Sequence, residues 1–174
     1  MNGFTRTARA AAAVVVSAYI VLVAAAAEED YIKHKEPVFP QVEAGHALVY
    51  FARPDFMRLL PNPTFKVFVN ATPIGSLPQR SYLTAQVEPG TLTVWGPTND
   101  GQPFTFEGGK TYLLVLTERY GPNRSFIGAS FRAFESAGVS SLVSDKKLVY
   151  VTPTDSSLTK LRVEGAKKFE KARE

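Results

Sequence analysis

The chain has 174 residues, of which 45% are hydrophobic and 11% aromatic, and 20 Lys and Arg balance 16 Asp and Glu. It contains no cysteine, which excludes disulfides, thiol catalysis, cysteine-based metal sites and a lipid-modified cysteine. The basic residues of its body form no cluster with interleaved aromatics, so nucleic-acid binding is not expected.

The first 27 residues have the pattern of an export signal. Arg6 and Arg9 precede an uncharged run, 10–27, which ends in four alanines directly before Glu28. A basic start, an apolar stretch and a small-residue edge are typical of a secretory signal peptide. The alternative is an uncleaved N-terminal anchor, because such a helix would span about 27 Å of a hydrocarbon core of roughly 30 Å. We therefore expect an exported protein of the periplasm or cell envelope, associated with the membrane through 10–27 if that segment is retained.

The next segment, 28–45, is polar and carries Pro37 and Pro40, so we predict a linker. From His46 onward, short β-rich runs alternate with turns containing Pro, Gly and Asn. This pattern of short strands and turns is typical of an all-β fold. We predict an antiparallel β-sandwich or open barrel of about 7–8 strands over 46–153. The expected strands are 46–52, 64–69, 72–77, 81–87, 92–95, 104–106, 111–118 and 125–134.

Two of these strands should be central in their sheet. The runs 47–51 and 112–116 are apolar at nearly every position, which indicates burial on both faces. Asn70 lies between two expected strands, where its tolerance of positive φ favours a tight hairpin.

The C-terminal third gives weaker patterns. Residues 136–145 read as a short helix or an irregular crossover, and 147–151 as a last strand. Residues 154–174 form a charged helical tail, in which Asp155-Ser156-Ser157 offers an N-cap. Gly165 interrupts this helix at a cost of about 1 kcal/mol relative to alanine. The tail's expected apolar stripe is Leu158, Leu161, Ala166 and Phe169.

Five segments in order resemble a known family. They are Ala47–Pro54 (ALVYFARP), Phe65–Asn70 (FKVFVN), Pro73–Leu77 (PIGSL), Ser81–Gly90 with its SYL and VEPG, and Gly109–Leu113 (GKTYL). Together they resemble the bacterial envelope family catalogued as domain of unknown function 2846, over about residues 46–135. The resemblance implies a small exported β-sandwich-like domain, often a lipoprotein, with no established enzymatic activity. The missing cysteine argues against a lipid anchor here.

Catalytic signals are sparse. The chain has two histidines, His34 and His46, and no Gly-x-Ser-x-Gly elbow. We therefore predict no catalytic residue, no cofactor and no metal site. A binding rim is predicted instead in the long interruption between the first two strands, where apolar and basic side chains occur together. Its residues are Arg53, Phe56, Met57, Arg58, Leu59 and Leu60. The alternative is that these apolar side chains fold back as a cap on the core.

These observations favour an exported, non-catalytic, envelope-associated β-domain that acts as a binding or scaffold module for an envelope protein or glycan. The alternative is a carboxylate-dependent hydrolase acting on cell-wall polymers. The sequence leaves the ligand and the oligomeric state open.

Overall fold

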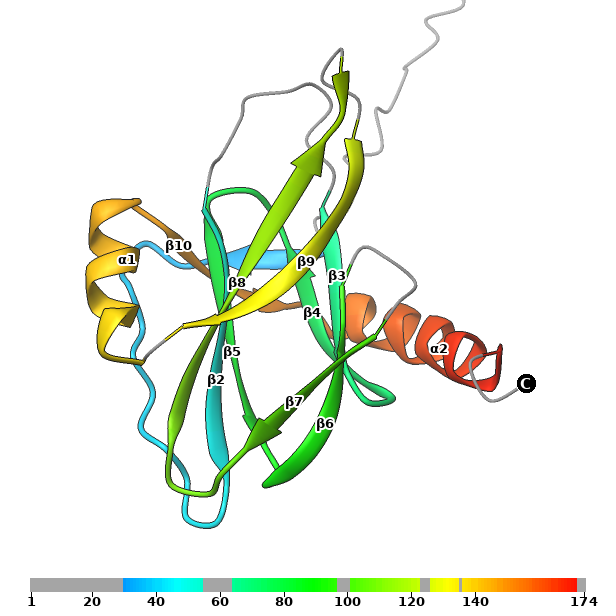
Figure 1. The fold of residues 1–174 in the computed structure, drawn as a ribbon, viewed down its shortest axis with the longest axis horizontal. Helices are drawn as coiled ribbons and strands as arrows, with labels where there is room; N and C mark the ends of the chain where they lie inside the picture. The colour runs from blue at the N-terminus through cyan, green and yellow to red at the C-terminus, as the bar shows by residue number, and fades with distance from the viewer. Residues whose placement is uncertain (1–29, 55–63, 97–100, 123–125, 135, 172–174) are drawn as a thin grey trace, which may run out of the picture.

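The computed structural model describes residues 30–54, 64–96, 101–122, 126–134 and 136–171. Within these ranges ten strands form two packed sheets, and each sheet carries a helix on its outer side (Figure 1). The predicted β-rich sandwich is therefore confirmed, whereas the predicted N-terminal helix lies outside the described residues. The elements are β1 (Tyr31–Lys33), β2 (Ala47–Arg53), β3 (Phe65–Val69), β4 (Thr72–Leu77), β5 (Ser81–Val87), β6 (Gly90–Trp95), β7 (Gln102–Phe106), β8 (Thr111–Tyr120), β9 (Phe126–Phe134), η2 (Ser136–Gly138), α1 (Val139–Asp145), β10 (Val149–Pro153) and α2 (Asp155–Lys171).

The larger sheet has the order β1-β10-β5-β2-β8-β9 and the smaller sheet β4-β3-β6-β7. Strands β2 and β8 are central, as their continuous apolar runs predicted. The expectation of a purely antiparallel sandwich is wrong, because β2 pairs in parallel with β8, and β10 with β5. The reason is the path of the chain. It leaves the larger sheet for the smaller one after β2 and after β5 before it returns as β8, and it reaches β10 from β9 through α1. Strands that return by a crossover can enter in parallel.

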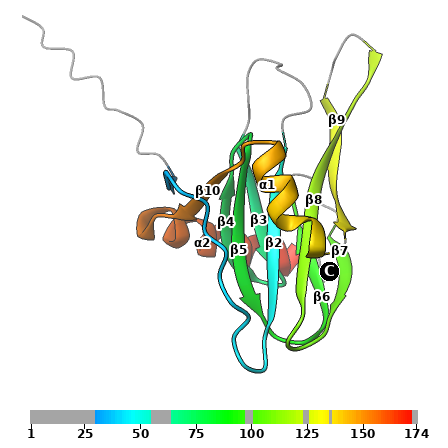
Figure 2. The same cartoon turned by 90° about the vertical axis from the view of Figure 1, so that its left-hand side faces the viewer.

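Two cores flank the larger sheet. The main core fills the space between the sheets, where Phe51 of β2 meets Leu114 and Leu116 of β8. A second core lies on the outer face, where Tyr50 packs beneath Val143 of α1. Figure 2 shows α1 in front of β2 and β8. Burial on both faces explains why all seven residues of β2 are buried.

Helix α2 covers the smaller sheet. It begins at Asp155, and its cap is Thr154 instead of a residue of the predicted run 155–157, because the Thr154 hydroxyl accepts the Ser157 N–H at 3.2 Å. Leu161 packs with Phe68 and Trp95. The buried stripe is Ser157, Leu161 and Gly165. Leu161 is thus confirmed, Leu158 is half-buried and Ala166 is exposed, so the prediction was wrong for Ala166. The side chain of Phe169 lies outside the described part of the helix.

The segment predicted as a linker is largely part of the domain. Its residues Tyr31–Lys33 form β1, which pairs with β10. The Tyr82 hydroxyl accepts the Val38 N–H at 2.7 Å and donates to the Val38 carbonyl at 3.0 Å. Gln86 Nε2 donates to the Gln41 carbonyl at 2.8 Å. A strand of three residues is too short to show alternation, which is why the sequence pattern missed it. Across the described ranges, no helix is long and apolar enough to cross a bilayer.

Candidate functional site: an apolar groove beside α1

An apolar groove of about 520 Å³ lies on the outer face of the larger sheet, between α1 and the strands β8 and β9. We call it the α1 groove. Its volume falls within the roughly 300–1,000 Å³ range of small-molecule sites. The lining residues are Pro54, Leu113, Val115, Phe134, Gly138, Leu142 and Lys146.

Strand β8 supplies the floor. Successive strand residues point to opposite faces, so Leu114 faces the main core while Leu113 and Val115 face the groove. Both floor side chains are buried, with 4% and 7% exposed. The floor therefore consists of packed aliphatic side chains fixed by the sheet.

Helix α1 supplies one wall. Gly138, Leu142 and Lys146 are four residues apart, which places them on one stripe of the helix. The neighbouring Val139 and Val143 are buried against the sheet. Since these two valines anchor the helix, the wall is preformed.

The groove meets solvent on the side of β9, where Phe134 at the end of the strand is 53% exposed. Pro54, which directly follows β2, is buried. A Cβ added at Gly138 would meet no atom within 4 Å. The absence of a side chain at Gly138 thus helps to keep the groove accessible.

The charge around the groove is positive. Lys146 lines it from the C-cap of α1 and is exposed. Arg132 is the cross-strand partner of Val115, so the two side chains share a face of the sheet, and Arg132 is also exposed. Among the described residues neither cation belongs to an ion pair. The nearby carboxylate of Asp145 accepts a hydrogen bond from Ser141 Oγ at 3.1 Å.

The predicted binding rim is only partly described. Arg53, expected at the surface, is 1% exposed and lies inside the sandwich, which corrects its assignment to a rim. It is the last residue of β2 and continues the inward-facing series of that strand. The other five residues, at positions 56–60, lie outside the described ranges, so that part of the rim stays a prediction.

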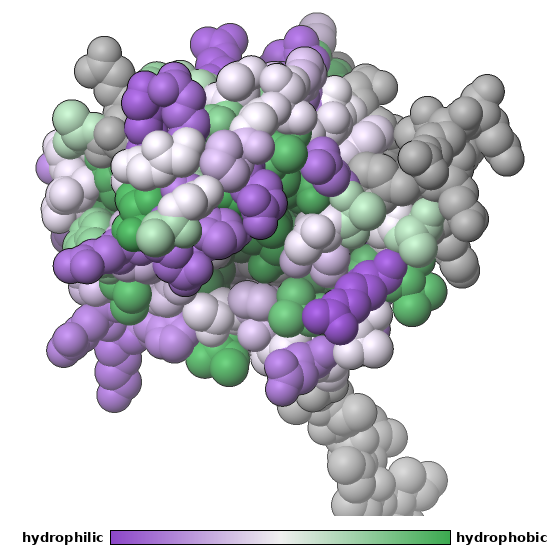
Figure 3. All heavy atoms as spheres, turned by 90° about the horizontal axis from the view of Figure 1, so that it is seen from below, coloured by the Kyte–Doolittle hydropathy of each residue, from purple (hydrophilic) through white to green (hydrophobic). Residues whose placement is uncertain are grey.

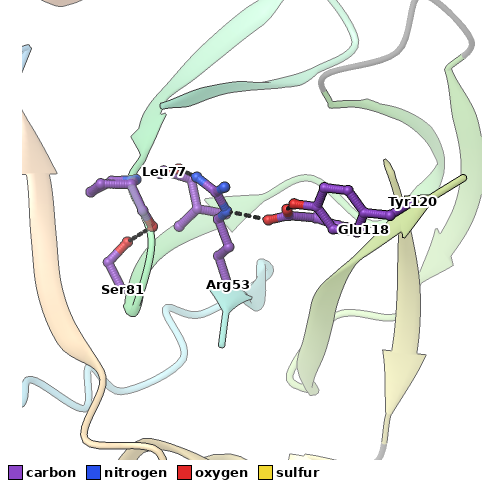
Figure 4. Close-up of polar contacts among 6 residues, drawn as sticks. Arg53, Leu77, Ser81, Glu118 and Tyr120 are labelled. Atoms are coloured by element: carbon purple, nitrogen blue, oxygen red, sulfur yellow. Dashed lines mark hydrogen bonds and ion pairs between the residues drawn. The ribbon is translucent and has the colours of Figure 1, made fainter. Parts of the chain in front are cut away.

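Arg53 joins the two sheets through a buried polar cluster (Figure 4). Its Nε donates to Glu118 Oε1 at 2.6 Å, and its Nη1 donates to the Leu77 carbonyl at 3.4 Å. The guanidinium carbon lies 4.1 Å from the ring centre of Phe65. Tyr120 donates its hydroxyl to the second carboxylate oxygen of Glu118. Because each polar group here has a partner within the fold, the cluster is structural.

The environment of Tyr120 raises its pKa to about 12. Burial is the largest cause, since it disfavours the charged phenolate. The hydrogen bond to Glu118 and the negative charge of that carboxylate act in the same direction.

Neither histidine lies at the groove. His34 Nε2 is 2.9 Å from the Thr152 hydroxyl, and its ring packs against Tyr150. His46 lies between the Ala44 carbonyl and Glu88, at 3.2 and 3.5 Å. In the part of the chain that the structure describes, no three His, Asp or Glu side chains gather as a metal site would require.

A second hollow, of about 180 Å³, lies beside the β3–β4 hairpin. Its lining mixes apolar residues with Asn70, Gln86 and Glu88, and it falls below the usual size of a ligand site. The lower face of the molecule likewise alternates hydrophilic and hydrophobic surface (Figure 3). The α1 groove is therefore the stronger candidate of the two.

No local sequence pattern points to the α1 groove. Its residues come from four segments between positions 54 and 146, and only the fold brings them together. The available signals were the continuous apolar run 112–116, which indicates burial on both faces, and the four-residue spacing of Gly138, Leu142 and Lys146. Comparisons with protein-family models, with curated proteins and with solved structures found no match. The family resemblance thus stays a prediction.

Proposed function

We propose that this protein is an exported, non-catalytic binding module of the cell envelope, and that the α1 groove holds its ligand. The observation that carries this proposal is the groove itself, whose floor and wall are fixed by buried residues while its mouth meets solvent. Concave, apolar and preformed sites are where proteins usually bind small ligands or an inserted side chain.

The residues that line the groove limit which chemical class of ligand can bind there. It offers aliphatic and aromatic side chains and one ammonium group. A glycan would bring hydroxyls that lose their water on entry and gain few hydrogen bonds, which is unfavourable. The apolar part of an envelope component is a better match. Export is supported by the basic and then apolar pattern of residues 1–27.

The hydrolase alternative requires two carboxylates on either side of a bound substrate. The α1 groove has no carboxylate among its lining residues. Binding is therefore the function that its geometry supports best.

The test is titration of the full chain with a neutral, environment-sensitive apolar dye, followed by fluorescence. We expect saturable binding that Gly138→Leu weakens at least about tenfold, or about 1.4 kcal/mol. The Gly138 backbone is in the right-handed helical region, at φ −83°, and the added side chain enters open space. The variant should therefore fold normally, which thermal unfolding will verify.

The matched control is Ser140→Leu, which adds the same side chain to an exposed position of α1 that does not line the groove. This variant should bind the dye like the parent protein. Equal binding by both variants, or no saturable binding by the parent, would contradict the proposal.

A further inference from the structure

We infer that the occupant of the α1 groove is a single-chain amphiphile with an anionic head, of the medium-chain fatty acid class. This inference rests on the proposed function, because it names the ligand of the same site. It follows from three features of the groove: its apolar lining, its length and the position of its positive charges.

The first feature is the lining. Leu113, Val115 and Leu142 offer only hydrocarbon to an occupant, and Phe134 adds an exposed ring. Each methylene removed from water stabilises a complex by about 0.8 kcal/mol. An alkyl chain gains this energy without bringing polar groups that would need partners.

The second feature is the length. Gly138 and Lys146 are separated by eight residues, which corresponds to about 12 Å along a helix axis. The groove thus extends along the full length of α1. An extended alkyl chain fits such a shape, and the volume of about 520 Å³ suits one small molecule.

The third feature is the charge at one end. Helix α1 and strand β8 run in the same direction (Figure 1), so Lys146 lies toward the Val115 end of the groove and Gly138 toward the Leu113 end. Arg132 is paired with Val115, which places it toward the same end as Lys146. Two cations therefore flank the end opposite Gly138. A carboxylate seated there would accept charge-assisted hydrogen bonds while its chain follows the floor toward Gly138.

The experiment compares three ligands with the same alkyl chain: dodecanoate, dodecanol and dodecylammonium. Each displaces the neutral dye from the full chain at low ionic strength and below its micelle concentration. We expect dodecanoate to displace the dye at concentrations at least about tenfold lower than dodecylammonium. Added salt should reduce this preference, because exposed charges are screened.

Lys146→Met removes the ammonium and keeps most of the side chain. With this variant the preference for dodecanoate should largely disappear, and Arg132→Gln should reduce it. The control is Lys160→Met, a charge removed at an exposed position of α2, which should leave the preference unchanged. A purely structural role of Lys146 at the end of α1 would not alter selectivity among head groups.

The outcomes separate the two proposals. Dye binding that Gly138→Leu abolishes, combined with equal displacement by all three ligands, would uphold the binding module and overturn the anionic amphiphile. Absence of saturable binding, both of the dye and of dodecanoate in direct calorimetry, would contradict both proposals. Sedimentation with anionic phospholipid vesicles that depends on Lys146, without displacement by dodecanoate, would favour a membrane surface and overturn the single-chain ligand.

Discussion

Arg53 keeps a positive charge inside the sandwich because the fold surrounds its guanidinium with suitable partners. Glu118 supplies the opposite charge, Leu77 a carbonyl and Phe65 an aromatic face. Removing one member of a buried pair leaves the other charge without compensation in a medium of low dielectric constant. The residue therefore matters for stability even though the sequence suggested a surface role.

We predict that Arg53→Met lowers the free energy of unfolding by about 3–5 kcal/mol, as measured by denaturant titration. Adding Glu118→Gln should recover part of the loss, since it removes the isolated charge. The control is Lys66→Met, which breaks the Lys66–Glu164 pair, whose side chains are 44% and 49% exposed. An exposed pair should contribute less than about 1 kcal/mol. Equal losses in Arg53→Met and Lys66→Met would show that the buried cluster has no special role.

Tyr120 gives this cluster a dependence on alkaline pH. Its pKa is raised to about 12 in the folded protein, from the ordinary tyrosine value of 10.0. The unfolded chain therefore releases this proton at lower pH, so the stabilisation is complete below pH 10 and is lost as pH rises toward 12. We predict that Tyr120→Phe flattens the fall in stability over that interval. Burial also raises the pKa values of Tyr50 and Tyr82. The stability of both the parent protein and Tyr120→Phe should therefore still fall somewhat with rising pH. An identical fall in stability with pH for the parent protein and the variant would show that Tyr120 does not cause this pH dependence.

At the scale of the elements, Gly165 shows why a residue of poor helix propensity can be favourable inside a helix. The sequence predicted an interruption of α2, yet the helix continues through this residue. A Cβ at Gly165 would lie 3.2 Å from Phe68 Cε1 and 3.4 Å from the Ala71 carbonyl. Glycine thus allows α2 to approach the β3–β4 hairpin closely, and that approach compensates for poor helix propensity.

We predict that Gly165→Leu lowers the free energy of unfolding by about 1–3 kcal/mol, because the larger side chain forces α2 away from Phe68. Gly165→Ala should be nearly neutral, since a propensity gain of about 1 kcal/mol offsets the crowding. Val163→Leu, at a position 58% exposed on the same helix, is the control and should change little. Stabilisation by Gly165→Leu in thermal melts would show that the contact is not tight.

The local elements were predictable from the sequence, but their partners were not. Runs such as 72–77 and 81–87 are flanked by turn residues, and both strands were predicted with the bounds that the structure gives. Asn70, at φ 50°, makes the hairpin that its side chain favoured. The pairing of β2 with β8 depends on residues more than sixty positions apart, which no local pattern encodes. The α1 groove depends on that pairing and therefore could not be predicted from the sequence.

At the scale of the whole molecule, the domain begins earlier in the chain than the pattern of strands and turns in the sequence indicated. Residues 31–42 contribute an edge strand and hydrogen bonds to β5. We predict that a protein starting at residue 30 melts within about 2 °C of the full chain, whereas one starting at residue 46 melts at least about 4 °C lower. Differential scanning calorimetry of the two proteins checks this. Equal melting temperatures would restore 28–45 as a simple linker.

The pairing of β1 with β10 has a consequence for how the chain matures. Tyr31 lies opposite Pro153, so an early-synthesised strand finds its neighbour only after more than a hundred further residues have been made. Contacts between such distant segments form slowly, because a long loop must close first. The larger sheet therefore reaches its full width only after β10 has been made. Until then β5 exposes the side on which β10 will dock, and a nascent chain held at that stage would be open to pairing with a foreign strand.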